Sequence, residues 1–292
     1  MTGSAQFRSG KGSGDENFPV ASWLVKRRHR PVILAFYEFV RTADDIADHA
    51  NLASSEKLSR LDRLEASLLG KSDEEPEGVR LREFLALRGL PTRHAQDLLD
   101  AFRQDAVKHR YSNWDDLIDY CSRSAMPVGR FVLDVHGEAK DTWPASDALC
   151  AALQIINHLQ DCAADYRRLD RVYIPLDALA ASGANVESLA KEKADVRLAA
   201  CIHELAAKTA VLLKQSDGLA VQVADVRLSL EIAAIQSLAR ELAGLLQVRD
   251  PLRDRVHLTR IEALAMTARG AGRALFQRLM RTGAARHGYQ AS

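Results

Sequence analysis

The fold of this chain is decided by the stretch Phe36-Tyr-Glu-Phe-Val-Arg-Thr-Ala-Asp-Asp-Ile-Ala-Asp48. It ends in an acidic pentad, and the preceding run from Pro31 to Val40 is too apolar for an exposed helix. Residues four apart lie on one helix face with Cβ atoms roughly 5–6 Å apart, so Asp44 and Asp48 project together. We therefore predict a polar line on a buried helix, whose members need partners or ligands.

A second pentad, Asp161-Cys-Ala-Ala-Asp165, repeats this pattern in an Ala-rich stretch. Gln154 and Asn157 precede it at helical spacing. One such pair alone is more often a solvated surface, but two buried stripes facing each other would line a cavity with one acidic end and apolar walls. Repelling carboxylates of this kind suit Mg²⁺, which binds carboxylate and phosphate oxygens. Such a cavity fits a ligand with a diphosphate head and a hydrocarbon tail.

The composition indicates one all-α domain, a helical bundle around a central cavity. The chain has 292 residues, 47% of them hydrophobic, with 16 Gly and only 8 Pro, which favours helices. We expect a disordered N-terminal tail over residues 1–14, the domain over 15–285 and a C-terminal tail over 286–292. Pro127 and Gly129 predict a kink within the helical region that they interrupt.

The charge and cysteine content exclude several classes. A net charge of +1 argues against nucleic-acid binding. The four cysteines lack metal-ligand spacing and fit a reducing compartment. We find neither an apolar run of roughly 18 residues nor a signal-peptide core. We expect a cytoplasmic protein that touches the inner membrane surface transiently through an Arg-rich C-terminal helix, with these arginines: Arg269, Arg273, Arg278 and Arg281.

Several motifs together resemble the squalene/phytoene synthases, the head-to-head branch of the all-α isoprenoid synthases. The resemblance covers about residues 15 to 280 and is strongest to the bacterial enzymes of hopanoid biosynthesis that make hydroxysqualene. The motifs are Glu16–Ser22, Phe36–Asp48, Phe102–Asp105, Tyr120–Arg130, Gln154–Asp165 and Arg171–Pro175. As an ordered set they are specific for the family and less decisive for the product.

The resemblance implies a role for each polar residue of the two stripes. Two or three Mg²⁺ ions with diphosphate would be held by Asp44, Asp45, Asp48, Asp161 and Asp165. Diphosphate would be bound by Arg41, Gln154, Asn157 and Arg171. The catalytic set would be Arg41, Tyr37, Tyr120 and Tyr173, although packing remains an equal alternative for each tyrosine.

The resemblance also implies a substrate pocket that excludes water and stabilises a carbocation with aromatic faces. Its expected lining is Phe18, Phe36, Ser124, Ala125, Gly129 and Phe131. Ordinary core packing is an alternative for each phenylalanine. Arg123 departs from the pattern of the better-known squalene synthases.

The implied reaction is Mg²⁺-dependent conversion of presqualene diphosphate to hydroxysqualene, with water capturing the carbocation and no NADPH. Squalene, presqualene diphosphate and phytoene remain alternative products, because all need the same head-group machinery. Two other classes stay open: a di-iron protein, although this usually requires Glu and Glu-x-x-His ligands, and a catalytically silent partner of isoprenoid enzymes. The oligomeric state is open.

Overall fold

The computed structural model describes residues 26–288, and helices dominate this part of the chain. Phe18, the motif Glu16–Ser22 and the predicted tail at 1–14 lie outside the described residues. The predicted all-α class is confirmed. The helices are α1 (Arg30–Ala47), α2 (Ser54–Leu68), α3 (Pro76–Arg88), α4 (Arg93–Asp105), α5 (Trp114–Ser124), α6 (Met126–His136), η2 (Lys140–Thr142), α7 (Trp143–Leu169), α8 (Leu176–Ser182), η3 (Val186–Ala190), α9 (Val196–Gln215), α10 (Leu219–Gln222), α11 (Val226–Leu246) and α12 (Arg260–Gly288).

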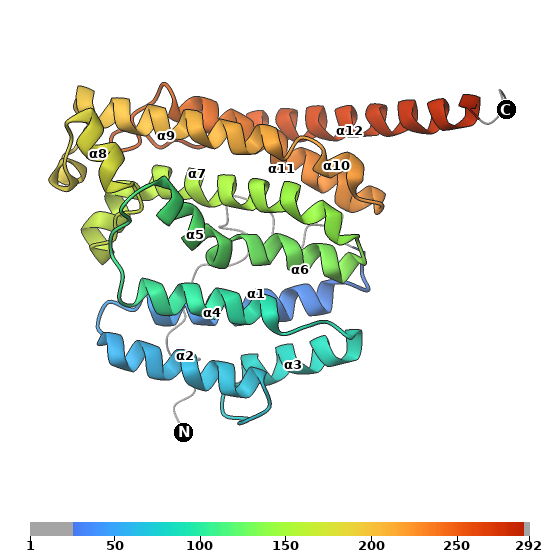
Figure 1. Ribbon diagram of the computed structural model, residues 1–292, viewed down its shortest axis with the longest axis horizontal. Helices are drawn as coiled ribbons and strands as arrows, with labels where there is room; N and C mark the ends of the chain where they lie inside the picture. Colours follow the sequence, from blue (N-terminus) through green and yellow to red (C-terminus); the bar gives the residue numbers. More distant parts are fainter. Residues whose placement is uncertain (1–25, 289–292) are drawn as a thin grey trace.

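The helices form successive layers, which Figure 1 shows from bottom to top. Helices α2 and α3 form the lowest layer, and α1 and α4 lie on them. The next layers are α5 with α6 and then α7, which is covered by α9 and α11. Helix α12 packs along α11 and its C-terminal half projects beyond the bundle. It runs to Gly288, past the predicted start of the C-terminal tail at residue 286.

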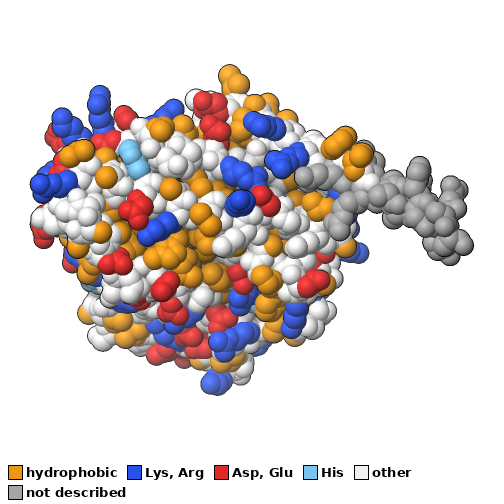
Figure 2. All heavy atoms as spheres, turned by 45° about the horizontal axis from the view of Figure 1, so that its top comes forward, with side chains coloured by type: hydrophobic (Ala, Val, Ile, Leu, Met, Phe, Trp, Pro, Cys, Tyr) orange, Lys and Arg blue, Asp and Glu red, His pale blue; other side chains and the backbone are white. Residues whose placement is uncertain are grey.

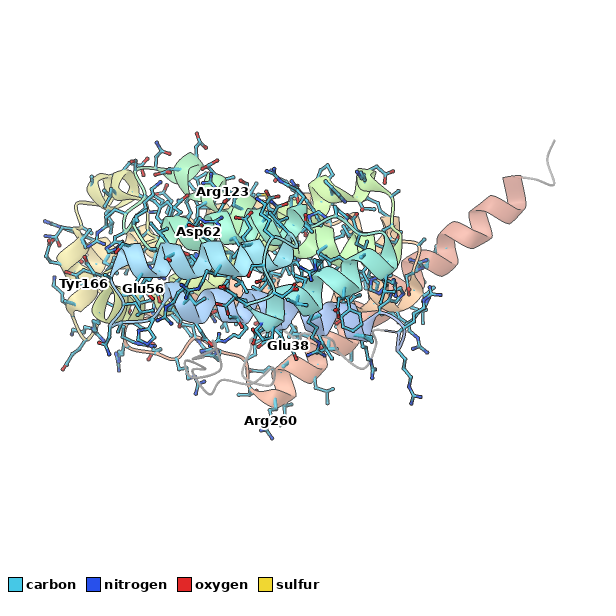
Figure 3. The ribbon with its side chains drawn as sticks, turned by 90° about the horizontal axis from the view of Figure 1, so that it is seen from below. Glu38, Glu56, Asp62, Arg123, Tyr166 and Arg260 are labelled. Atoms are coloured by element: carbon cyan, nitrogen blue, oxygen red, sulfur yellow. The ribbon has the colours of Figure 1, made fainter. Side chains whose placement is uncertain are left out.

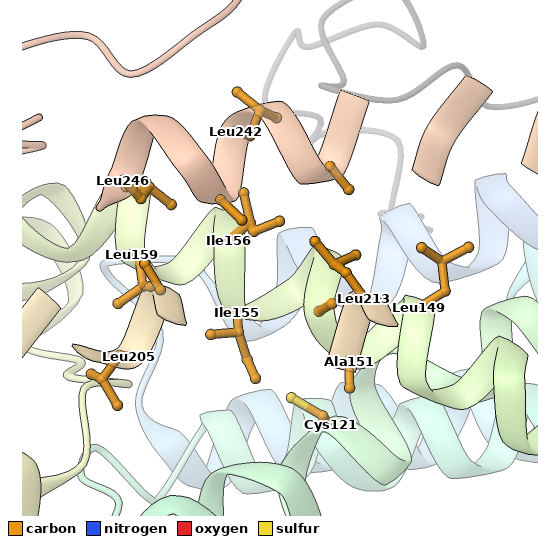
Figure 4. Packing of buried hydrophobic residues seen from close by; sticks show 14 of the residues in the cluster. Cys121, Leu149, Ala151, Ile155, Ile156, Leu159, Leu205, Leu213, Leu242 and Leu246 are labelled. Atoms are coloured by element: carbon orange, nitrogen blue, oxygen red, sulfur yellow. The ribbon is translucent and has the colours of Figure 1, made fainter. Parts of the chain in front are cut away.

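Helix α7 is the central element of the larger hydrophobic core. Its Ile155 and Ile156 are almost completely buried, and Figure 4 shows them between Leu242 of α11, Leu205 of α9 and Cys121 of α5. Burying one such aliphatic side chain contributes about 1.5–3 kcal/mol. A second core holds α1 to α4 together around residues such as Phe39. This packing explains why both acidic helices are apolar on every face except one.

The predicted kink is a complete break between two helices. Helix α5 ends at Ser124, and Ala125 leaves the helical conformation with φ −131° and ψ −47°. Pro127 lies in the first turn of α6, where its missing N–H costs nothing. Gly129 allows α6 to approach α7, since a Cβ there would overlap Ser146 Oγ and Cys150 Sγ.

An extended segment follows α7. Asp170 ends the helix with a positive φ of 51°, and the chain then returns beside the loop between α4 and α5. The amide of Val172 donates to the carbonyl of His109 (2.9 Å), and that of Leu176 donates to Tyr111 (2.9 Å). These bonds hold Tyr173 and its neighbours in the interior, and Arg171, directly before them, is buried as well.

Candidate active site

The polar stripe of α1 is present as predicted. Tyr37, Arg41 and the three aspartates of the pentad are partly buried, on a helix that is otherwise fully buried at its inner positions. The guanidinium of Arg41 binds Asp44 (2.9 Å) and Asp45 (3.0 Å). This pairing offsets part of the repulsion within the pentad and fixes its orientation.

Arg171 connects the extended segment after α7 to the C-terminal end of α1. Its side chain is buried, and it donates to Asp48 Oδ1 (2.5 Å) and to the carbonyl of Ala47 (3.0 Å). Burial alone would lower the pKa of Arg171, but the nearby charges of Asp105 and Asp48 help to raise it above its ordinary value. A permanent cation therefore lies between the two acidic helices.

Asp105 is a buried member of the site that our sequence analysis did not assign. Its carboxylate accepts hydrogen bonds from the hydroxyls of Tyr120 (2.7 Å) and Tyr173 (3.1 Å). Burial raises the pKa of Asp105 to about 6, although Arg171 and both tyrosines oppose the shift. One signal was readable: Asp105 continues the buried positions His94, Leu98 and Ala101 of α4 at helical spacing.

The stripe of α7 runs from partly buried residues to an exposed one. Gln154, Asn157 and Asp165 are partly buried, whereas Asp161 is exposed. Gln154 contacts His158 (Nε2–Nε2 3.0 Å), and the ring of His158 stacks on Tyr173. Gln154 of α7 is therefore connected, through His158 and Tyr173, to Asp105.

The charge of the α1 pentad influences the pKa of a carboxyl in the α7 stripe. Burial first, and then Asp48, raises the pKa of Asp44 to about 7. Burial, Asp161 and then Asp48 raise the pKa of Asp165 to about 7. Asp48, directly after α1, thus acts on Asp165 of α7 as well as on Asp44 of α1. The hard oxygens of these carboxylates are the donors that Mg²⁺ prefers, so their chemistry fits the predicted metal. Among the described residues, however, no three of the five aspartates have ligand atoms within 4.8 Å of one another.

The predicted pocket residues divide into two groups. Phe36 and Phe131 stack on each other (centroids 3.8 Å apart) in the core between α1 and α6, which is the packing role that we kept as an alternative. Ala125 is buried, and the buried hydroxyl of Ser124 has no hydrogen-bond partner among the described residues. The break between α5 and α6 therefore offers one polar atom to a ligand.

Arg123 has a structural explanation. Its guanidinium binds Asp119 (2.7 Å) and Gln104 (2.7 Å), and Gln104 in turn donates to the hydroxyl of Tyr111 (3.3 Å). Figure 3 shows Arg123 at the edge of the bundle. Through Gln104, Arg123 therefore fixes the position of the Tyr111 hydroxyl.

A second group of metal-ligand atoms lies away from this site. His29, His136 and Asp225 have ligand atoms within 4.8 Å of one another. Three cations already surround them: Arg28 (3.0 Å) and Arg88 (2.8 Å) contact His29, and Lys26 binds Asp225 (2.8 Å). A further cation would be repelled here, so the group serves as a polar junction of α1, α6 and α11.

The fold and the paired acidic helices define a class, and sequence comparison identifies it. The chain belongs to the squalene/phytoene synthase family, whose model matches residues 12–262.

Individual relatives within the family carry the name of a particular enzyme. The chain is 58% identical over 262 residues to a hydroxysqualene synthase of Rhodopseudomonas palustris, covering 90% of each protein. It is 57% identical over 264 residues to one of Sinorhizobium fredii, again covering 90% of each. The crystal structure of squalene synthase HpnC from Alicyclobacillus acidocaldarius is 30% identical, with a TM-score of 0.71 over 83% of this chain and 90% of that one.

Proposed function

We propose that this enzyme converts presqualene diphosphate to hydroxysqualene in hopanoid biosynthesis, with release of diphosphate and capture of the carbocation by water. The observation that carries the proposal is that Arg171 binds Asp48 of the first pentad and that its charge also acts on Asp165 of the second. The hydroxysqualene synthases that are 58% and 57% identical to the chain support the choice of product.

In ionisation, different residues of the chain bind the metal and the diphosphate. Mg²⁺, when bound, neutralises the charge that develops on the departing diphosphate, and it would be held by Asp44, Asp45, Asp48, Asp161 and Asp165. Arg41 and Arg171 present planar donor groups that match phosphate oxygens. Gln154 and Asn157 orient the same head group from α7.

The tyrosines shape the space beside the head group. Tyr120 and Tyr173 direct their hydroxyl protons toward Asp105, so their oxygens keep lone pairs, while the ring of Tyr173 stacks on His158 and on Tyr111. Tyr37 lies on the same stripe as Arg41. These groups hold positive charge in place without supplying a proton or a hydride.

Labelled water tests the reaction. Incubation with presqualene diphosphate and Mg²⁺ in ¹⁸O-labelled water is expected to place the label in the product hydroxyl, because water is the nucleophile. Adding NADPH is expected to leave the product unchanged. Squalene that forms only with NADPH would reject this proposal in favour of a reductive synthase.

The lipid substrate requires access from a membrane surface. No helix within residues 26–288 is long and apolar enough to cross a membrane, and Figure 2 shows a face on which acidic, basic and hydrophobic side chains are mixed. Helix α12 exposes Ile261, Leu264 and Phe276, and we propose that this helix makes transient contact with the membrane.

The arginines of α12 contribute unequally to this contact. Arg278 donates to the carbonyls of Val223 (2.7 Å) and Ala224 (3.0 Å), and Arg269 and Arg273 line a cavity of about 280 Å³ between α11 and α12. Arg269 and Arg273 are nevertheless exposed, so the apolar contribution is tested separately from charge. Sedimentation with anionic vesicles should decrease for Phe276→Ser; equal binding by this variant contradicts the role of α12.

A further inference from the structure

His158 lies among the head-group residues of α7 and has no role in the machinery described so far. Its ring stacks on Tyr173 with centroids 3.5 Å apart and 16° between the planes, and it is 6.0 Å from the ring of Tyr120. The ring is only partly buried. Within the described part of the chain, its one hydrogen-bond partner is Gln154, at Nε2. Nδ1 therefore has no hydrogen-bond partner within this part of the chain.

The imidazole of His158 is uncharged under ordinary conditions. Burial, and then the nearby charge of Arg171, lowers its pKa to about 3. A neutral imidazole has one N–H and one lone pair. A half-turn of the Gln154 carboxamide exchanges its oxygen and nitrogen without moving other atoms. With the oxygen toward the ring, Gln154 accepts the Nε2 proton and Nδ1 keeps its lone pair.

Three carboxylates of the site are already engaged. Asp105 accepts from both tyrosines, Asp48 accepts from Arg171, and Asp44 from Arg41. Each of these carboxylates would also attract a carbocation and risk bonding to it. An uncharged ring nitrogen can hold a water molecule without competing for the cation.

We infer that His158 positions the water that captures the carbocation and accepts its proton through Nδ1. The inference rests on the proposed function. Ionisation breaks the carbon–oxygen bond to diphosphate, which leaves with the electron pair. The oxygen of the held water then forms a bond to the cationic carbon, and a proton moves from that oxygen to Nδ1. A weak base is sufficient, because a protonated alcohol is a far stronger acid than an imidazolium. The imidazolium later returns its proton to bulk water.

The test compares product identity with diphosphate release. His158→Phe keeps the aromatic stacking on Tyr173 but removes both nitrogens. We expect diphosphate release to continue, while the share of alcohol among the products falls about tenfold or more. Unsaturated hydrocarbons formed by proton loss should replace it. His158→Gln, which can still hold a water, should restore part of the alcohol.

The control is His203→Phe, the same substitution at a partly exposed histidine of α9, and it should keep the wild-type alcohol share. The share is a ratio of products, so partial unfolding of a variant does not alter it. An unchanged share in His158→Phe overturns the inference alone. Loss of diphosphate release at an unchanged share also overturns it, because His158 would then act in ionisation. A wild-type enzyme that forms no alcohol overturns both this inference and the proposed function.

Discussion

Asp44 and Asp165 hold their protons to about pH 7 because they are buried beside other carboxylates. Such a cluster weakens the protein in the absence of a cation, since each ionised oxygen has lost water and gained a like-charged neighbour. Arg41 and Arg171 offset this only in part. The carboxylates are therefore explained by ligand binding and not by folding.

Replacing single carboxylates separates their contribution to ligand binding from their contribution to folding. Asp44→Asn and Asp161→Asn should each lower kcat about 10²-fold or more, a loss typical of removing one electrostatic contact to the transition state. The free energy of unfolding should stay within about 0.5 kcal/mol or increase. Steady-state assays and urea denaturation measure the two effects.

The matched control is Asp62→Asn on α2, where Asp62 pairs with Arg103 at the surface shown in Figure 3. This variant should keep full activity. Near-normal turnover in Asp44→Asn would remove that residue from the metal site.

Residue spacing predicted both stripes, because the four-residue period of a helix is local information. Asp105 could be placed only by tertiary contacts, since its partners Tyr120 and Tyr173 lie 15 and 68 residues away. Arg171 was predicted as a phosphate ligand. Its bond to Asp48, 123 residues away, depends on how the extended segment turns back after α7.

At the scale of elements, glycines decide how closely the helices approach. Gly270 of α12 is buried against α11, and a Cβ there would overlap the carbonyl of Ala233. Gly272, two residues later, has open space around it. The sequence marks both only as weak helix formers, so their difference is visible only in the packed structure.

This difference gives a paired test of the α11–α12 contact. Gly270→Ala should lower the free energy of unfolding by about 1–3 kcal/mol, the usual cost of overpacking. Gly272→Ala should raise it by about 0.5–1 kcal/mol through better helix propensity. Denaturant titration measures both, and hydrogen exchange should show faster opening of α12 in the first variant. Equal effects would contradict the described packing.

The prolines predict interruptions of the helical pattern, but only the structure shows where each interruption lies. Pro127 is the second residue of α6 and does not bend it, because the break is at Ala125. Pro144 similarly lies in the first turn of α7, which begins at Trp143. A proline in the first helical turn and one at a break look alike in a single sequence.

At the scale of the whole molecule, the site lies where two hydrophobic cores meet. Asp44 and Asp48 belong to α1 in the smaller core, and Asp161 and Asp165 to α7 in the larger one. Val132 of α6 packs against both cores. The pairing of Arg171 with Asp48 is one polar link across this boundary. A ligand that binds both acidic helices adds a second link and should stabilise the whole bundle.

The pH dependence of this stabilisation follows from the carboxyl pKa values. An unfolded chain loses these protons near pH 3.8, whereas the folded protein keeps those of Asp44 and Asp165 to about pH 7. The folded state binds more protons between these values, so these groups lower the free energy of unfolding as pH rises from about 4 to 7. Mg²⁺ binds only the ionised carboxylates and must displace protons at pH 6 but not at pH 8.

Mg²⁺ with inorganic pyrophosphate should therefore raise the Tm more at pH 8 than at pH 6, and calorimetry at both values measures the difference. Asp165→Asn removes one of the two titrating groups and should reduce this pH difference, while Asp62→Asn should leave it unchanged. A Tm increase that is equal at both pH values would mean that the ligand does not engage Asp44 and Asp165, and that the two halves of the bundle are not joined through their carboxylates.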